Sequence, residues 1–172
     1  LTLMVAVATC EAITAATGIS ATIKWPNDIL VNGKKVAGIL TEVSSEVDRV
    51  EFALIGIGLN VNTPVDSLPK RVIFPATSLA KEAGAPQARA IILAHWLEQV
   101  ETEYAQLAEG DRKGLLDHWK SLTSIIGRRA TIQRVNDNAC GTIEDIDSDG
   151  ALLLITADGE RLRVLSGDVS FE

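Results

Sequence analysis

Two consecutive β-hairpin signals constrain the fold of this chain more than any other feature. Asn32-Gly33 is a strong two-residue hairpin turn, because both residue types tolerate positive φ. It is followed by a strand-like run at Lys35–Val43, a polar turn at Ser44–Asp48 and a second run at Val50–Asn60. Short strand-like runs at 21–24 and 29–31 precede the first turn. The pattern predicts an antiparallel meander.

Helical patterns lie on both sides of the meander. Leu1–Thr17 is apolar almost all round, which is typical of a buried helix, and Gly18 is placed to end it. Thr77 is expected to cap a short helix that ends at Gly84. Amphipathic spacing predicts two more helices, over Gln87–Ala108 and Arg112–Thr123.

The pattern changes near Gly127. Five short β-like runs follow within about 45 residues, separated by turn signals such as Asp149-Gly150. This spacing predicts a small β-barrel. The runs are Ala130–Val135, Cys140–Ile146, Ala151–Ile155, Arg161–Leu165 and Val169–Phe171. We therefore expect an α/β domain over residues 1–126, with a mostly antiparallel sheet, and a small barrel domain over residues 127–172.

Composition excludes several classes of protein. A net charge of −7 argues against a protein that binds nucleic-acid backbones, which would carry a basic surface. Cys10 and Cys140 are too few for a disulfide framework or a zinc site, so we expect reduced thiols in a cytoplasmic protein. No apolar run approaches the roughly 20 residues of a membrane span.

Three motifs occur in order in the first third of the chain. They are Lys24-Trp25-Pro26-Asn27-Asp28, then Lys35-Val36-Ala37-Gly38-Ile39-Leu40, then Ile55-Gly56-Ile57-Gly58-Leu59-Asn60-Val61-Asn62. In type and spacing they resemble biotin protein ligases, that is biotin–[acetyl-CoA-carboxylase] ligases. The resemblance implies a catalytic core like that of class II aminoacyl-tRNA synthetases and an SH3-like C-terminal barrel. It also implies ATP and Mg²⁺ as cofactors, biotin as substrate, and a biotin carboxyl carrier protein as acceptor.

The resemblance implies two catalytic residues, Lys35 and Asp28. Lys35 would stabilise negative charge on the reacting carboxylate and phosphate. Asp28 would face the reacting centre and hold the acceptor amine or take its proton. Lys34 and Lys35 are adjacent, and on a strand only one of them can face inward.

The same resemblance implies a substrate- and nucleotide-binding set. Its members are Lys24, Trp25, Asn27, Gly38, Ile39, Leu40, Gly56, Gly58 and Asn60. Gly38 would allow close approach of substrate, and the amide of Asn60 suits an adenine edge or a ribose. Trp25 equally suits a ring that is simply buried beneath the turn. No metal ligands are expected in the protein.

Other polar residues are expected to be structural or surface groups. His95 and His118 lie on helical patterns without a catalytic partner at useful spacing. Glu98, Glu101 and Glu103 are expected to form a solvated helix face.

A glycine/arginine-rich loop that covers biotin in this family is not present, and we expect the chain to be the C-terminal portion of a longer ligase. A lipoate or octanoate ligase or transferase is an alternative, as is a non-catalytic fragment of a biotin-sensing repressor. An exposed strand edge makes a homodimer plausible.

Overall fold

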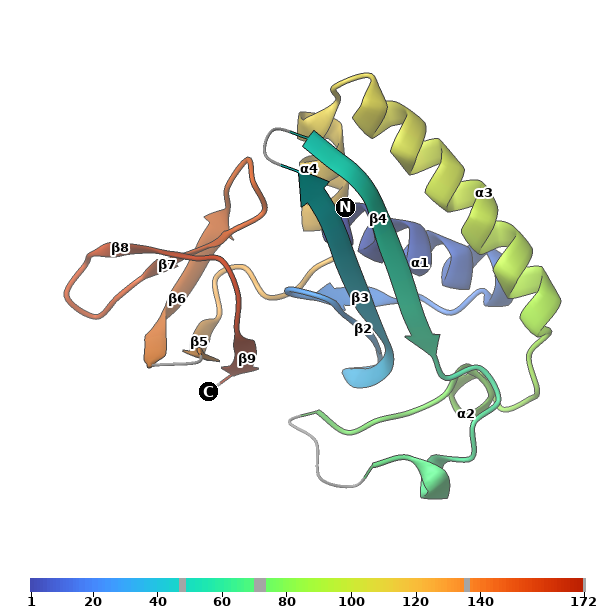
Figure 1. Ribbon diagram of the computed structural model, residues 1–172. Helices are drawn as coiled ribbons and strands as arrows, with labels where there is room; N and C mark the ends of the chain where they lie inside the picture. Colours follow the sequence, from blue (N-terminus) through green and yellow to red (C-terminus); the bar gives the residue numbers. More distant parts are fainter. Residues whose placement is uncertain (47–48, 70–73, 135–136, 172) are drawn as a thin grey trace.

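The computed structural model describes residues 1–46, 49–69, 74–134 and 137–171. The chain folds into a four-stranded, helix-covered sheet followed by a second sheet of five strands (Figure 1). Both sheets are antiparallel, so the predicted fold class is confirmed. None of the described helices is both long and apolar enough to span a lipid bilayer.

The first sheet contains four strands in sequence order. They are β1 (Thr22–Lys24), β2 (Asp28–Val31), β3 (Lys34–Glu46) and β4 (Arg49–Leu59). Asn32 and Gly33 have φ values of 51° and 72°, which confirms the predicted hairpin turn between β2 and β3. The predicted turn over residues 44–48 is shorter than expected, because β3 continues to Glu46; residues 47 and 48 lie outside the described part.

Four helices accompany this sheet. They are α1 (Thr2–Thr17), α2 (Leu79–Ala83), α3 (Arg89–Ala108) and α4 (Arg112–Ser121), with a short 3₁₀ turn at Val65–Ser67. In Figure 1, α1 and α3 lie side by side next to the sheet. Every residue of α1 from Met4 to Cys10 is buried, as its all-round apolarity predicted. Gly18 ends the helix with φ of 70° and donates its N–H to the Thr14 carbonyl.

The cap of α2 differs from the prediction. Ser78, not Thr77, is the N-cap, and its hydroxyl accepts a hydrogen bond from the Lys81 N–H at 3.4 Å. Thr77 instead donates its hydroxyl to Glu82 at 2.6 Å. The Thr77 hydroxyl is therefore bound to the Glu82 carboxylate, and the helix is capped by the next residue, Ser78.

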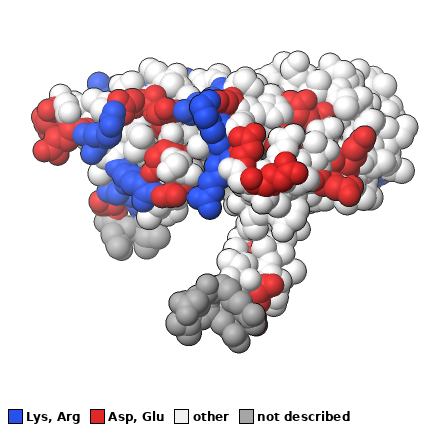
Figure 2. Space-filling model, turned by 90° about the horizontal axis from the view of Figure 1, so that it is seen from above, with Lys and Arg blue, Asp and Glu red and all other residues white. Residues whose placement is uncertain are grey.

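The second sheet lies to one side of the first (Figure 1). Its strands are β5 (Arg129–Gln133), β6 (Asn138–Ile146), β7 (Leu152–Ile155), β8 (Arg161–Val164) and β9 (Asp168–Phe171). They run in the order β8-β7-β6-β5-β9 around a core that includes Ile132, Ile143 and Leu154. Seen from above, Lys and Arg alternate with Asp and Glu over these strands, whereas the helical side shows mainly Asp and Glu (Figure 2).

His118 of α4 contacts side chains of two other helices. His118 of α4 contacts Glu11 of α1 through Nε2 at 3.0 Å and Glu103 of α3 through Nδ1 at 3.2 Å. The Glu103 side chain is only 6% exposed, so its predicted place on a solvated helix face is wrong. Burial of that carboxylate is compatible with folding because the imidazole supplies a partner.

We expect His118→Ala to lower the free energy of unfolding by about 1–3 kcal/mol, since it leaves the buried Glu103 carboxylate unpaired. Urea unfolding at neutral pH measures the change. His95→Ala is the matched control, because His95 meets the exposed Glu98 at 3.7 Å only. Equal effects of the two substitutions would contradict a specific role for His118.

Candidate functional site

The three sequence motifs meet at one end of the first sheet. Lys24 at the end of β1 lies opposite Asp28 at the start of β2, and Asp28 lies opposite Gly38 of β3. Gly38 in turn lies opposite Gly58 of β4. The meander therefore places these residues in a row across four neighbouring strands.

Asp28 is held between two ammonium groups. Its Oδ2 lies 3.3 Å from Lys24 Nζ, and its Oδ1 forms a salt bridge with Lys35 Nζ. Lys24 is 2% exposed, whereas the Lys35 side chain is 39% exposed. Two cations and one anion leave a net positive charge, and Lys35 presents it to solvent. This arrangement suits an anionic ligand above the sheet.

The two adjacent lysines point to different partners. Lys34 Nζ lies 3.1 Å from Glu82 Oε1, whereas Lys35 reaches Asp28. Strand alternation separates them in this way, because neighbouring side chains face opposite sides of a sheet. Of the two lysines, Lys35 is thus the one placed at the candidate site.

Glycines keep the surface beside Lys35 open. A Cβ added at Gly38 would lie 3.3 Å from Lys35 Nζ and 3.4 Å from Lys35 Cε, which is closer than ordinary contact. Gly56 and Gly58 are exposed on β4, where Gly56 lies opposite Leu40. Leu40 is 61% exposed, so the strip offers an apolar surface next to a cation.

The remaining predicted residues contribute in different ways. Asn27 donates its side-chain amide to the Ile39 carbonyl at 2.8 Å, and the Ile39 side chain is buried in the core. Asn60 forms backbone hydrogen bonds with Val36 and Leu79, while its side-chain amide makes none to any described residue. The Asn27 side chain therefore stabilises the turn by binding β3, and the Asn60 side-chain amide is available for a ligand.

Glu82 fixes the hairpin that carries the two lysines. Its carboxylate accepts hydrogen bonds from Thr77 at 2.6 Å, Asn32 at 2.8 Å and Lys34 at 3.1 Å. The Thr77 and Asn32 hydrogen bonds, with the Lys34 ammonium, lower the pKa of Glu82 to about 2. The ionised form is thus strongly preferred in the folded chain.

Sequence reasoning missed an aromatic residue at the site. The Lys24 ammonium lies 4.6 Å from the ring centroid of Phe74, and Phe74 makes an edge-to-face contact with Phe171 of β9 at 5.9 Å. Phe74 is the only aromatic residue in the Pro-containing loop 63–76. A lone aromatic residue in this loop was the only sequence signal for Phe74, and the neighbouring residues do not indicate that it contacts Lys24 and Phe171.

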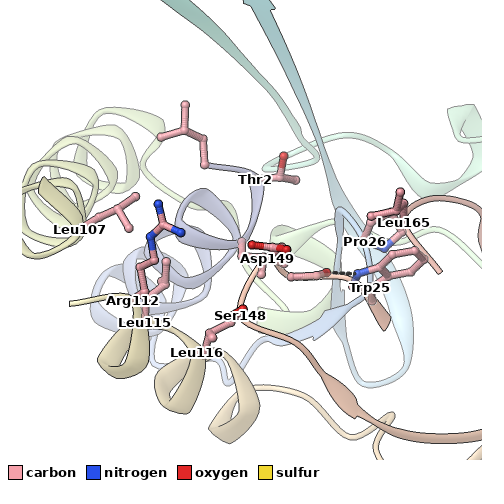
Figure 3. A pocket seen from close by; sticks show the side chains of 13 residues that line it. Thr2, Trp25, Pro26, Leu107, Arg112, Leu115, Leu116, Ser148, Asp149 and Leu165 are labelled. Atoms are coloured by element: carbon pink, nitrogen blue, oxygen red, sulfur yellow. Dashed lines mark hydrogen bonds between the residues drawn. The ribbon is translucent and has the colours of Figure 1, made fainter. Parts of the chain in front are cut away.

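Trp25 lies on the buried side of the turn. It is 1% exposed, and its indole N–H donates to the Gly150 carbonyl between β6 and β7 at 3.0 Å. Trp25 and Pro26 line a cavity of about 500 Å³ between α1, α4 and the β6–β7 turn (Figure 3). Lys24, Asp28 and Lys35 do not line that cavity, so it is separate from the charged site.

Family models match both parts of the chain. The model of the biotin/lipoate A/B protein ligase family matches residues 1–62, and the model of the biotin protein ligase C-terminal domain matches residues 125–172. The chain belongs to the biotin protein ligase family.

Curated relatives agree with this membership. The bifunctional ligase/repressor BirA of Bacillus subtilis is 40% identical over 169 residues, which is 98% of this chain and 52% of the relative. The biotin–[acetyl-CoA-carboxylase] ligase of Mycobacterium tuberculosis is 34% identical over 149 residues, or 86% of this chain and 52% of the relative. The chain thus spans about half the length of these relatives.

Solved structures show the same fold. The apo biotin protein ligase of Aquifex aeolicus superposes with a TM-score of 0.85 at 26% identity, covering 99% of this chain and 73% of the other. The complex of that ligase with biotin and ATP gives 0.81 at the same identity, covering 99% and 69% of the two chains. The roles of individual site residues stay predictions.

We expect Glu82→Gln to destabilise the chain by about 1–3 kcal/mol near neutral pH, with a loss that depends on pH. Because the folded-state pKa is lowered, the Glu82 contribution is complete above its ordinary value of about 4.5 and disappears as the pH falls through about 2. The gap between wild type and variant should therefore narrow between about pH 5 and about pH 3 in urea unfolding. Glu98→Gln is the control, since the Glu98 side chain is 70% exposed. A gap that is constant with pH would contradict the assignment.

Proposed function

We propose that this chain is part of an enzyme that activates biotin with ATP and transfers it to a lysine of a biotin carboxyl carrier protein. The observation that carries the proposal is the Asp28 carboxylate held between Lys24 and Lys35 beside an open glycine strip. Family membership and the names of the curated relatives support it. The cytoplasmic location expected from the sequence is part of the same proposal.

In the first step, the biotin carboxylate attacks the α-phosphorus of ATP. The bond to pyrophosphate breaks, and the mixed anhydride biotinyl-5′-AMP forms. Negative charge increases on the α-phosphate oxygens in the transition state, so a fixed cation beside them lowers the barrier. Lys35 is placed for this role, because its ammonium is half-exposed and oriented by Asp28.

In the second step, the acceptor amine attacks the carbonyl carbon of the anhydride. The carbon–oxygen bond to AMP breaks, and the nitrogen loses a proton. Asp28 is the carboxylate nearest to Lys35, so it would attract the incoming ammonium and take up that proton. The buried Lys24 would hold Asp28 in place throughout.

Substrate binding is assigned to the surfaces next to Lys35. Gly38, Gly56, Gly58 and the exposed Leu40 would carry the apolar part of biotin, and Asn60 would meet the adenosine. The described residues contain no cluster of three or more His, Cys, Asp or Glu suited to a metal ion. Mg²⁺ would therefore arrive on the nucleotide phosphates, where it neutralises charge.

The proposal also covers the roles of the two domains and their assembly into a homodimer. We assign the catalytic role to residues 1–126 and the supporting role to the C-terminal domain from residue 127. The β4 edge carries exposed Phe52 and Leu54, and a strand edge of this kind would permit a sheet-to-sheet homodimer.

The first test is the intact mass of a carrier domain after incubation with the chain, biotin and Mg-ATP. One sample contains the 172-residue chain alone, and a second also contains the half of the Bacillus subtilis relative that this chain does not match. A biotinyl mass gain in either sample, absent without this chain, supports the proposal. No gain with biotin but a gain with lipoate or octanoate would favour the related acyl-transfer activity, and no gain at all would favour a biotin-sensing fragment.

We expect Lys35→Ala to slow adenylate formation at least ~10²-fold, the scale for one placed electrostatic contact. Release of pyrophosphate in the presence of biotin measures it. Lys34→Ala is the matched control, because its ammonium is bound to Glu82 and should matter little for the rate. Near-normal adenylation by Lys35→Ala would contradict the role of Lys35.

The glycine strip provides a second matched pair. We expect Gly38→Ala to lower adenylation about tenfold or more by displacing the Lys35 ammonium from its place. Gly58→Ala should have a smaller effect, because the nearest atom to an added Cβ there is the Gly38 oxygen at 4.0 Å. The two rates are measured in parallel, and a larger loss for Gly58→Ala would rule out the Gly38–Lys35 explanation.

A further inference from the structure

The C-terminal sheet is linked to the turn that carries Asp28 by one direct contact and one indirect contact. The first is the hydrogen bond from the Trp25 indole to the Gly150 carbonyl, which is drawn in Figure 3. The second runs from Lys24 through the Phe74 ring to Phe171 of β9. Lys24 and Trp25 are neighbours in sequence, so two consecutive residues are linked to the second sheet, Trp25 directly and Lys24 through Phe74.

The Gly150 end of the hydrogen bond is itself fixed. Gly150 has φ of 84°, and a Cβ there would lie 2.7 Å from Leu3 Cδ1 of α1. The carboxylate of Asp147 accepts hydrogen bonds from the N–H groups of Asp149 and Ala151, which closes the turn around Gly150. The carbonyl is therefore presented to Trp25 by a rigid turn that packs closely against the first domain.

The Trp25 end leads directly to the charged site. Pro26 and Asn27 separate Trp25 from Asp28, and Asn27 exchanges two hydrogen bonds with Ile39 of β3. Movement of the Trp25 ring would thus be passed to Asp28 through a short turn with little freedom. Asp28 in turn orients Lys35.

We propose that Trp25 is a positioning residue, whose bond to Gly150 makes the placement of Asp28 and Lys35 depend on docking of the C-terminal sheet. This inference deepens the proposed function and rests on it for its catalytic consequence. The structural part, which is the coupling between the β6–β7 turn and the Asp28 turn, can be tested without activity. A displacement of about 1 Å at reacting groups is enough to reduce a rate substantially.

The chain offers two matched controls. Trp96 of α3 also donates its indole N–H, to Thr9 Oγ1 of α1 at 3.0 Å, and neither residue belongs to the candidate site. Lys120 of α4 pairs with Asp145 of β6 at 2.8 Å, so Lys120→Met loosens the same interface without touching the turn. Trp25→Phe keeps an aromatic ring and removes the N–H.

Amide hydrogen exchange on the 172-residue chain is the first measurement. We expect Trp25→Phe to raise exchange about three- to tenfold in both segments, 24–28 and 149–151, the scale for one lost hydrogen bond. Trp96→Phe should change neither segment, and Lys120→Met should leave residues 24–28 unchanged. Faster exchange confined to 149–151, or equal effects of the two tryptophan substitutions, would overturn the inference.

Adenylation kinetics give the catalytic readout. We expect Trp25→Phe to lower kcat about tenfold with KM for biotin and ATP within about threefold, because positioning acts on the transition state. If Trp25→Phe raises exchange in both segments but the wild type makes no adenylate even with the unmatched half of the Bacillus subtilis relative, the coupling is supported and the proposed function is rejected. If the wild type is active and Trp25→Phe changes neither kcat nor amide exchange, the coupling is rejected and the proposed function is supported.

Discussion

The candidate site depends on one buried interaction, the Asp28 carboxylate between the ammonium groups of Lys24 and Lys35. A buried carboxylate is tolerated only with partners, and a buried lysine equally needs its anion. Lys24 satisfies this need from inside the protein. Lys35 satisfies it from the solvent side, and so keeps a charge available to a ligand. The meander, the Asn32-Gly33 turn and the absence of a side chain at Gly38 all serve to bring these groups together.

The second sheet contributes to this arrangement by contact, and none of its described residues supplies a charged group to it. Trp25 binds the Gly150 carbonyl, and Phe171 supports Phe74 over Lys24. Elsewhere, Lys120 of α4 forms a salt bridge with Asp145 of β6 at 2.8 Å. The second sheet is thus linked to the end of β1, to the following turn and to α4.

Local sequence patterns predicted the parts of the fold that are decided locally. The Asn32-Gly33 turn, the helix stop at Gly18 and the buried helix α1 each follow from residue type and period. The motif also indicated that Lys24, Asp28, Lys35 and Gly38 belong together. What the sequence could not predict are partners distant along the chain. Glu103 is buried because His118 meets it, and Phe74 reaches the site through Lys24. These contacts depend on how helices and sheets pack, which no local period encodes.

The central claim is that Lys35 and Asp28 serve the activation of a biotin carboxylate. Isotope exchange between pyrophosphate and ATP tests this most directly, because it reports formation of the acyl adenylate alone and needs no acceptor protein. We expect exchange that requires biotin, is not supported by lipoate or octanoate, and is lost in Lys35→Ala but retained in Lys34→Ala. Exchange that is equal in the two lysine variants, or that depends on lipoate or octanoate and not on biotin, would contradict it.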